Sequence, residues 1–293
     1  AFVKRKTKRN LKYYPTALFL PKAPFCDTET GMSLLCRDSS VMLEPIFEKI
    51  GGVVCMSATL HPEEFYLELL GFDKGNFSFL SYRSMFPLEN RNCYVISDVL
   101  TQYKYRERQA PKTAEKILDI IENCSGNIAV YFSSFGHMAQ VLPLIHLDER
   151  PSLQQVPRMS EEDRSDFVET MKKAEGHVLF AVMGGIFSEG VDLPNDALVC
   201  AVMIGPALPA ATLERRKIQE WNDEKYGAGF LYSWVVPGMA RVAQAGGRVI
   251  RTPTDKGVVV LIGSRFHTKI YQQCIPQDWY PQLTTNIAKD INS

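Results

Sequence analysis

Three nearly continuous apolar segments constrain the fold of this chain most strongly. They are HVLFAVMGG (177–185), ALVCAVMIG (197–205) and KGVVVLIG (256–263), and none of them alternates apolar with polar residues. A strand that is apolar on both faces is typical of a parallel sheet covered by helices on both sides. Shorter apolar runs at 93–97 and 127–134 read as further strands of the same kind. The sequence therefore predicts a doubly wound α/β fold.

Helical patterns occupy the connections between these runs. Apolar residues recur at helical spacing in PKTAEKILDIIENC (111–124), and a capping-box pattern opens the segment 160–176. The segment 61–71 reads as a helix that ends at a glycine, after a buried strand and a polar turn at 51–60. A mostly helical insertion is expected at about 206–243. This alternation of strands and helices supports the parallel sheet.

Composition and charge exclude few partners. The formal net charge of the 293 residues is zero, although residues 1–12 hold six Lys and Arg and no acid. Such a tail is more often a solvated terminus than a binding arm. The longest uncharged run, 197–211, is too short to span a bilayer and contains Pro206 and Pro209. We expect no membrane association.

The seven cysteines are scattered and form no C-x-x-C pair. This usage predicts no metal site and favours a reducing, intracellular compartment, cytoplasmic or, in a eukaryote, nuclear. No signal peptide is recognisable at the N-terminus.

Four polar, turn-rich segments are expected on one rim of the sheet, where ligands of such folds bind. They are SATL (57–60), SSFG (133–136), GGIFSEGVDLP (184–194) and QAGGRVIR (244–251). The serines suit nucleic-acid phosphates, and they suit the capped end of a strand equally well.

Two arginines in the last segment carry the strongest chemical signal. Arg248 and Arg251 are three residues apart, so on a helix they would share a face and could reach one polyphosphate. The alternative is a surface helix with two solvated arginines. In the preceding segment, glycines would let backbone N–H groups hold phosphate, and Asp192 could bind a ribose hydroxyl or Arg248. The alternative there is an ordinary loop between a strand and a helix.

Several nucleotide-binding signatures are missing. The chain has no G-x-x-x-x-G-K-[ST] sequence, no Asp-Glu pair closing an apolar strand and no Cys/His metal array. Arginines without a phosphate loop form an incomplete site, which would be completed by another domain.

Taken in order, these segments resemble the C-terminal half of the XPD/DinG family of DNA helicases, which have two RecA-like motor domains. SATL resembles motif III, VYFSSF (130–135) motif IV, GGIFSEGVDL (184–193) motif V and QAGGRVIR motif VI. The lead-in at 34–60 resembles the return from the family's arch into the first motor domain. The resemblance covers about residues 34 to 280.

The resemblance implies a RecA-like parallel sheet with helices on both faces. Residues 1–60 would be the end of the first motor domain and the arch return, and residues 61–293 the second motor domain with its insertion. It implies a part of an ATP-dependent 5′-to-3′ DNA helicase that binds single-stranded DNA and shares ATP and Mg²⁺ with the first motor domain. The iron–sulfur cluster of the family is expected outside this chain, and the protein is expected to be a monomer.

The resemblance also implies roles for individual residues. The catalytic set is Arg248, Arg251 and Gln244, and the set that binds or senses the cofactor is Gly190, Asp192, Gly247 and Glu189. The nucleic-acid set is Ser133, Ser134 and Ser188, with Ser57 and Thr59 relaying between the two sites. One departure concerns Arg265: the family has an acidic residue shortly before this arginine, whereas Gly263 and Ser264 stand here.

Two other classes of function remain open. One is a non-catalytic module that binds single-stranded nucleic acid or a protein, which the intact Gln244, Arg248 and Arg251 set disfavours. The other is a Rossmann-type enzyme, which is disfavoured because no G-x-G-x-x-G follows any strand.

Overall fold

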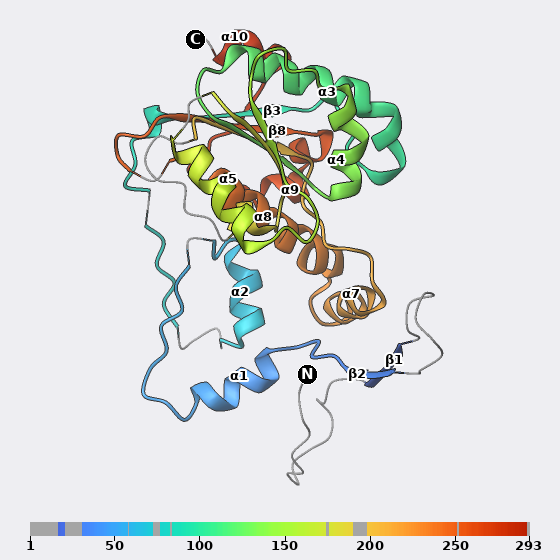
Figure 1. Cartoon of the computed structure of the whole chain (residues 1–293). Helices are drawn as coiled ribbons and strands as arrows, with labels where there is room; N and C mark the ends of the chain where they lie inside the picture. Colours follow the sequence, from blue (N-terminus) through green and yellow to red (C-terminus); the bar gives the residue numbers. More distant parts are fainter. Residues whose placement is uncertain are drawn as a thin grey trace. The chain divides into compact units, whose positions relative to one another are not determined.

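The computed structural model in Figure 1 describes residues 17–20, 31–57, 59–72, 77–82, 84–173, 176–189, 198–250 and 252–291. The chain divides into two compact units. The first comprises Ala1–Ser81 and Pro209–Trp234, and the second comprises Tyr82–Leu208 and Val235–Ser293.

The second unit is built on a seven-stranded sheet in which every pair of neighbouring strands is parallel. In spatial order the strands are β5 (Ser152–Gln154), β6 (Val178–Val182), β4 (Ile128–Phe132), β7 (Cys200–Ile204), β8 (Gly257–Ile262), β3 (Arg91–Ile96) and β9 (Gln282–Leu283). The predicted parallel α/β sheet is confirmed.

Helices cover both faces of this sheet. One face packs against α3 (Arg106–Asn123), α4 (Phe135–Val141) and α10 (Ile287–Ile291), whose apolar side chains form one buried cluster with alternate strand residues such as Phe132. The other face carries α5 (Glu161–Lys173), α6 (Ile186–Glu189) and α8 (Val236–Gly246). Figure 1 shows α5 and α8 on one side of the sheet and α3 and α4 on the other.

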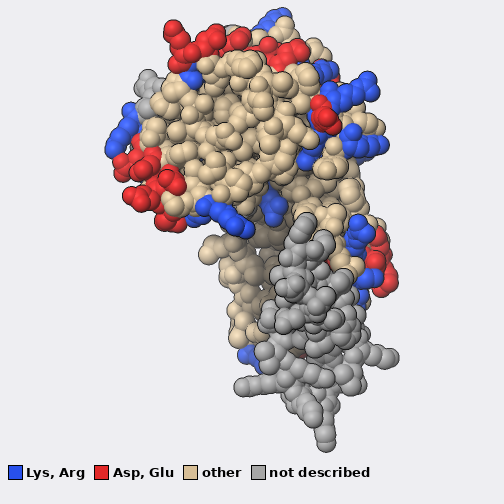
Figure 2. Space-filling model, turned by 45° about the vertical axis from the view of Figure 1, so that its right-hand side comes forward, with Lys and Arg blue, Asp and Glu red and all other residues tan. Residues whose placement is uncertain are grey.

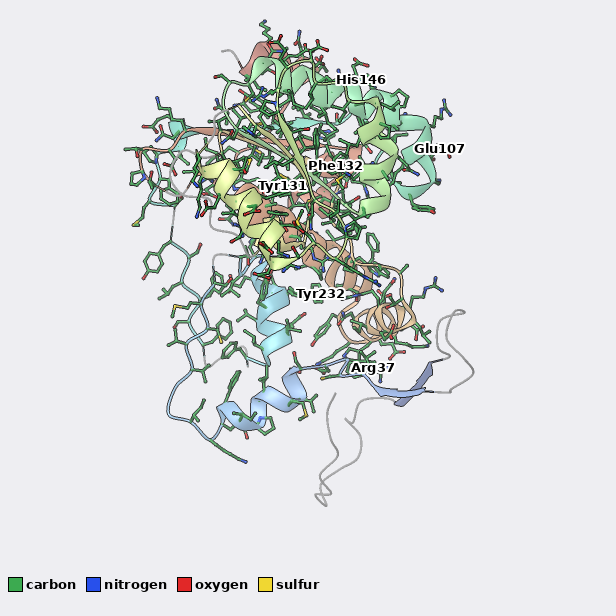
Figure 3. All side chains as sticks on the ribbon, viewed as in Figure 1. Arg37, Glu107, Tyr131, Phe132, His146 and Tyr232 are labelled. Carbon is green, nitrogen blue, oxygen red and sulfur yellow. The ribbon has the colours of Figure 1, made fainter. Side chains whose placement is uncertain are left out.

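The alternation of side chains along β4 illustrates the two layers. Phe132 belongs to the cluster with α3 and α4, whereas the hydroxyl of Tyr131 donates a 3.2 Å hydrogen bond to the carbonyl oxygen of Phe187 in α6 (Figure 3). The Phe187 ring stacks on Phe167 of α5 at 5.7 Å. Both residues of the strand are buried, which explains why the run is apolar throughout.

A local sequence signal accounts for the start of α5. The backbone N–H of Asp163 donates to the hydroxyl of Ser160 at 3.0 Å, as the capping-box pattern predicts for α5. Helix α3 begins at Arg106, ahead of Pro111, after a short 3₁₀ turn at Tyr103–Tyr105.

The first unit contains α1 (Ser40–Phe47), α2 (Glu63–Leu70), α7 (Leu213–Tyr226) and the antiparallel pair β1 (Ala17–Leu20) and β2 (Gly31–Leu34). The predicted stop of α2 at Gly71 is confirmed, since this residue has a left-handed φ of 74°. The segment expected to be mostly helical, at about 206–243, contains α7 and a π-helical turn at Leu231–Val235, and it continues into α8 of the second unit.

The strand predicted within 51–60 is wrong. Residues 52–57 have no regular secondary structure, and Val54 and Met56 are 85% and 87% exposed. An apolar run becomes a strand when a neighbouring strand pairs with it, and no strand that the structure describes pairs with this segment.

Candidate nucleotide and nucleic-acid sites

Two of the four polar segments meet at the carboxyl edge of the sheet. Ser133 and Ser134 follow β4, and Gly184 and Gly185 follow the neighbouring strand β6. The N–H of Met183 donates to the carbonyl oxygen of Phe132 at 2.9 Å, which keeps the two strand ends in register.

The expectation that segment 244–251 shares this rim is wrong. Helix α8 carries the chain back across the sheet from β7, so the segment 244–251 precedes the amino end of β8. SATL belongs to the first compact unit, where the N–H of Thr59 donates to the hydroxyl of Ser57 at 3.2 Å and both side chains form an exposed pair.

Arg248 connects the third and fourth polar segments. Its Nε atom donates a 2.8 Å hydrogen bond to the carbonyl oxygen of Ser188. Ser188 is fully buried, and its own hydroxyl donates to the carbonyl oxygen of Gly185 at 2.9 Å. The backbone carbonyl of Ser188 therefore holds the side chain of Arg248.

Arg241 is the basic residue of α8, and the sequence analysis missed it. It packs against Gly184, which has a left-handed φ of 73°; a Cβ atom there would lie 2.9 Å from Nε of Arg241. Arg241 and Gln244 lie three residues apart on α8, and this spacing was the available signal.

The helix ends before Arg248, so Arg248 does not lie on it. A Cβ atom on Gly246 would lie 2.3 Å from the Trp279 ring, and the next residues, Val249 and Ile250, turn into the core. Gly247 follows the last helical residue and donates its N–H to the carbonyl oxygen of Ala243 at 2.9 Å. Gln244 is exposed and Arg248 half-buried.

Several predicted residues lie outside the described part of the chain. Arg251, Gly190 and Asp192 are among them, and of Glu189 only the backbone is described, in α6. Their roles stay predictions.

Arg106 holds the two serines at the end of β4. Its Nη2 donates to Ser133 Oγ at 2.9 Å, its Nη1 to Ser134 Oγ at 3.3 Å, and its Nε to the carbonyl oxygen of Thr101 at 3.2 Å. The sequence analysis missed this arginine. The available signal was the basic and aromatic run YKYRER (103–108) at the start of a helix.

Arg265 reaches the same backbone group as Arg106. Its Nη2 donates to the carbonyl oxygen of Thr101 at 3.2 Å and to Thr101 Oγ1 at 3.3 Å. The two guanidinium groups thus converge at the carboxyl edge, near the ends of β3, β4 and β8.

His137 lies next to this cluster. Its Nδ1 lies 3.2 Å from Ser133 Oγ, and its ring is buried against the edge of Phe132. Burial, together with the positive charges of Arg106 and Arg265, lowers the pKa of His137 to about 3. The imidazole is therefore neutral at physiological pH and adds no third positive charge.

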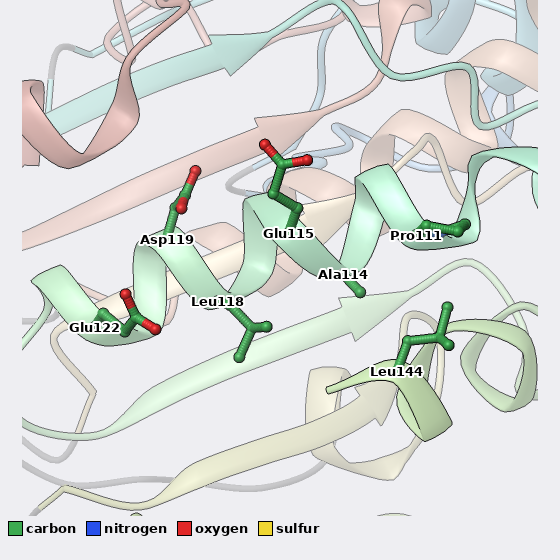
Figure 4. Close-up of a pocket in the computed structure, with 7 residues that line it drawn as sticks. All are labelled: Pro111, Ala114, Glu115, Leu118, Asp119, Glu122 and Leu144. Atoms are coloured by element: carbon green, nitrogen blue, oxygen red, sulfur yellow. The ribbon is translucent and has the colours of Figure 1, made fainter. Parts of the chain in front are cut away.

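Other features of the described residues do not suit polyphosphate. An open groove of about 390 Å³ lies along α3, but Glu115, Asp119 and Glu122 line it (Figure 4). No group of three or more His, Cys, Asp or Glu in the described ranges could hold a metal ion. Within the same ranges, no helix has the length and apolar character needed to cross a membrane.

Charge is distributed in small groups over the surface. On the face shown in Figure 2, Lys and Arg lie beside Asp and Glu and do not form one continuous basic area. Recognition of an anion would therefore depend on local clusters such as Arg106 with Arg265.

The seven-stranded parallel sheet with helices on both faces has the architecture of a RecA-like domain. The model of the helicase C-terminal domain matches residues 117–282, which is more than half of the chain. The chain belongs to this family.

Relatives and solved structures agree with this assignment. A protein of Methanocaldococcus jannaschii named as a probable ATP-dependent helicase is 29% identical over 263 residues, which cover 81% of this chain and 38% of the relative. The XPD/RAD3 helicase subunit of general transcription and DNA repair factor IIH from Saccharomyces cerevisiae is 26% identical, covering 81% of this chain and 33% of that protein. The chain thus spans less than half of these relatives.

Two solved structures share the fold. A structure named as an XPD helicase has a TM-score of 0.67 at 20% identity, covering 85% of this chain and 45% of that one. A structure named as apo XPD has a TM-score of 0.68 at 22% identity, covering 86% and 53%. The resemblance to XPD-type helicases inferred from the motifs is confirmed.

Proposed function

We propose that this chain is the C-terminal motor domain of an ATP-dependent DNA helicase. The observation that carries the proposal is the hydrogen bond from Arg248 to Ser188, because it joins the two segments that resemble motifs V and VI. In the complete protein, Arg248 and Arg251 contact the γ-phosphate of an ATP held mainly by the first motor domain. Residues 61–293 form the second motor domain, and residues 1–60 belong to the end of the first.

The chain's own residues serve three purposes in this mechanism. Arg248 and Arg251 supply positive charge where negative charge builds up on the transferred phosphoryl group. Gln244 lies at the same interface between motor domains. Glu189, Gly190, Asp192 and Gly247 link the nucleotide to the DNA groove. Ser133 and Ser134 contact DNA phosphates, with Ser57 and Thr59 as the relay. For Ser188 we now favour positioning of Arg248, because its hydroxyl is buried and bonded to Gly185.

We infer that ATP and its Mg²⁺ are shared with the first motor domain. The described residues contain no group of three or more His, Cys, Asp or Glu that could hold a metal ion. No step that we assign to this chain passes through the metal.

Movement follows from the loss of the γ-phosphate. ATP draws the two motor domains together because the arginines gain charge-assisted contacts, and hydrolysis weakens those contacts. Each domain grips the backbone of the single strand, so closure and opening move the strand in small steps. The 5′-to-3′ direction, the location inside the cell and the monomeric state rest on the resemblance and the composition alone.

ATP hydrolysis by the complete protein, measured with and without single-stranded DNA, tests the proposal. We expect hydrolysis that DNA stimulates and that Arg251→Ala reduces steeply, while binding of single-stranded DNA persists. Hydrolysis unchanged by Arg251→Ala would remove this arginine from catalysis. Binding without any hydrolysis would favour a non-catalytic single-strand-binding module.

A further inference from the structure

Two guanidinium groups converge on a single carbonyl oxygen at the carboxyl edge of the sheet. Arg106 Nε and Arg265 Nη2 each lie 3.2 Å from the carbonyl oxygen of Thr101. The three residues come from the loop after β3, the start of α3 and the turn after β8. The fold therefore places two like charges side by side.

Thr101 is fixed in position by two glycines. It is only 1% exposed, and a Cβ atom on Gly205 or Gly263 would lie 2.7 Å or 2.9 Å from its Oγ1. Both glycines have positive φ, 72° and 145°, which side chains rarely adopt. The glycines that follow β7 and β8 thus pack closely against Thr101, whose carbonyl oxygen accepts hydrogen bonds from both arginines.

The two arginines lack an acidic partner. None of the ion pairs among the described residues includes Arg106 or Arg265. Nε of Arg265 is buried and has no hydrogen-bond partner among the residues that the structure describes. Burial lowers the pKa of both guanidinium groups, and for Arg106 the charge of Arg265 adds to this effect. Burial of paired like charges is unfavourable unless an anion compensates it.

The two residues before Arg265 carry no charge. They are Gly263 and Ser264, and a Cβ atom at 263 would lie 2.9 Å from Thr101 Oγ1. These positions therefore supply no carboxylate to the arginine pair.

An exposed aromatic ring lies beside the arginine pair. The side chain of Tyr103 is 86% exposed, and its ring centroid is 5.9 Å from Cζ of Arg106. An exposed tyrosine next to a cation is the arrangement on which single-stranded nucleic acids stack their bases. Hydroxyl groups of Ser133 and Ser134 border the same guanidinium.

We propose that Arg106 and Arg265 bind one backbone phosphate of single-stranded DNA and that Tyr103 stacks on an adjacent base. The proposal rests on the function proposed above and adds residues that its motifs do not include. Free phosphate shares the chemistry of a backbone phosphate, whereas only a nucleic acid supplies a base for Tyr103.

The first experiment separates stacking from charge, using the complete protein. Binding is measured to oligodeoxythymidine and to an abasic strand of equal length, by fluorescence anisotropy. Tyr103→Ala should weaken binding of oligodeoxythymidine about 10-fold and leave the abasic strand unaffected, while Tyr103→Phe retains wild-type affinity. Tyr103 is exposed, so its replacement does not threaten folding.

The second experiment supplies an internal anion. Ser134 caps α4 by accepting the N–H of His137 at 3.2 Å, and Asp and Asn cap helices as well as Ser does. Ser134→Asp places a carboxylate against Arg106 and should reduce affinity for both strands about 10-fold to 100-fold. Ser134→Asn has the same shape without charge and should bind at least 5-fold more tightly than Ser134→Asp.

The third experiment uses the salt dependence of binding to test whether Arg106 contacts one DNA phosphate. Arg106→Gln should lower the slope of log affinity against log salt by about 0.7, the value for one phosphate of a single strand. Arg108→Gln is the matched control, because Arg108 is exposed on the same helix and should leave the slope unchanged.

Three results would overturn the proposal: equal affinity of Ser134→Asp and Ser134→Asn, an unchanged salt slope in Arg106→Gln, or full affinity in Tyr103→Ala. Competition by inorganic phosphate with no effect of Tyr103→Ala would identify a free-phosphate site and refute the DNA site. In each of these cases hydrolysis that depends on Arg251 would still stand, so the two proposals fail separately.

Discussion

The Nε atom of Arg248 lies 2.8 Å from the carbonyl oxygen of Ser188, a residue sixty positions earlier in the chain. The acceptor is a backbone carbonyl, so the Ser188 side chain acts on Arg248 indirectly, by holding this turn through its own hydrogen bond to Gly185. The half-buried guanidinium is thus oriented before any nucleotide binds.

Loss of this arginine should affect chemistry more than DNA binding. In the complete protein we expect Arg248→Ala and Arg251→Ala to lower kcat of ATP hydrolysis by about 10³ or more, the effect of an arginine that stabilises phosphoryl transfer. Phosphate release in steady state is the measurement. Arg216→Ala, an exposed arginine on α7, is the control, and equal rates in all three variants would refute the assignment.

The isolated chain should bind DNA without hydrolysing ATP. It has no G-x-x-x-x-G-K-[ST] sequence, so ATP lacks its phosphate loop. Binding to single-stranded DNA should weaken as salt rises, because backbone contacts release counterions. Anisotropy titrations at several salt concentrations check this. Turnover by the chain alone, or affinity that does not depend on salt, contradicts the prediction.

His137 should make stability depend on pH. Its folded-state pKa of about 3 lies below the value of 6.5 in an unfolded chain, so the unfolded state binds more protons between these values. The stability that His137 contributes is present above pH 6.5 and is lost as pH falls, by up to about 1.4 kcal/mol per pH unit. Denaturant unfolding of wild type and His137→Gln should therefore diverge below pH 6.5. Parallel pH profiles would show that His137 is protonated in the folded state.

The glycine at the end of β7 should not tolerate a side chain. Gly205→Ala combines a left-handed φ with a Cβ atom 2.7 Å from Thr101 Oγ1. Gly176→Ala is the matched control, since φ is 81° there and nothing lies within 4 Å. We expect Gly205→Ala to reduce the free energy of unfolding by about 1–3 kcal/mol more than Gly176→Ala. Equal losses would mean that Thr101 moves aside easily.

The central strands could be predicted because a strand that is buried on both faces is apolar at nearly every position. Ile128–Phe132, Val178–Val182 and Cys200–Ile204 are buried at every position. The edge strands, Ser152–Gln154 and Gln282–Leu283, have no such apolar run, because they are short and mainly exposed. The same reasoning failed at 53–56, where an apolar run has no strand to pair with.

The site could be predicted only where its residues are close in sequence or match a motif. Ser133 and Ser134 follow a strand and stood out for that reason. Arg106 contacts Ser133 from 27 residues away and Arg265 contacts Thr101 from 164 residues away, so neither contact has a local signature. The place of segment 244–251 could have been predicted, because a segment that directly precedes a strand of a parallel sheet lies at the amino edge of that sheet.

The acidic groove along α3 limits where a bound strand can run. Helix α3 begins at Arg106 and carries Glu115, Asp119 and Glu122 further along, with Lys116 close to two of these carboxylates. A polyanion bound at the start of this helix, as we propose, would be repelled along its length, so its favourable path would cross the carboxyl ends of the β-strands. One helix would thus both bind the nucleic acid and set the direction in which it leaves.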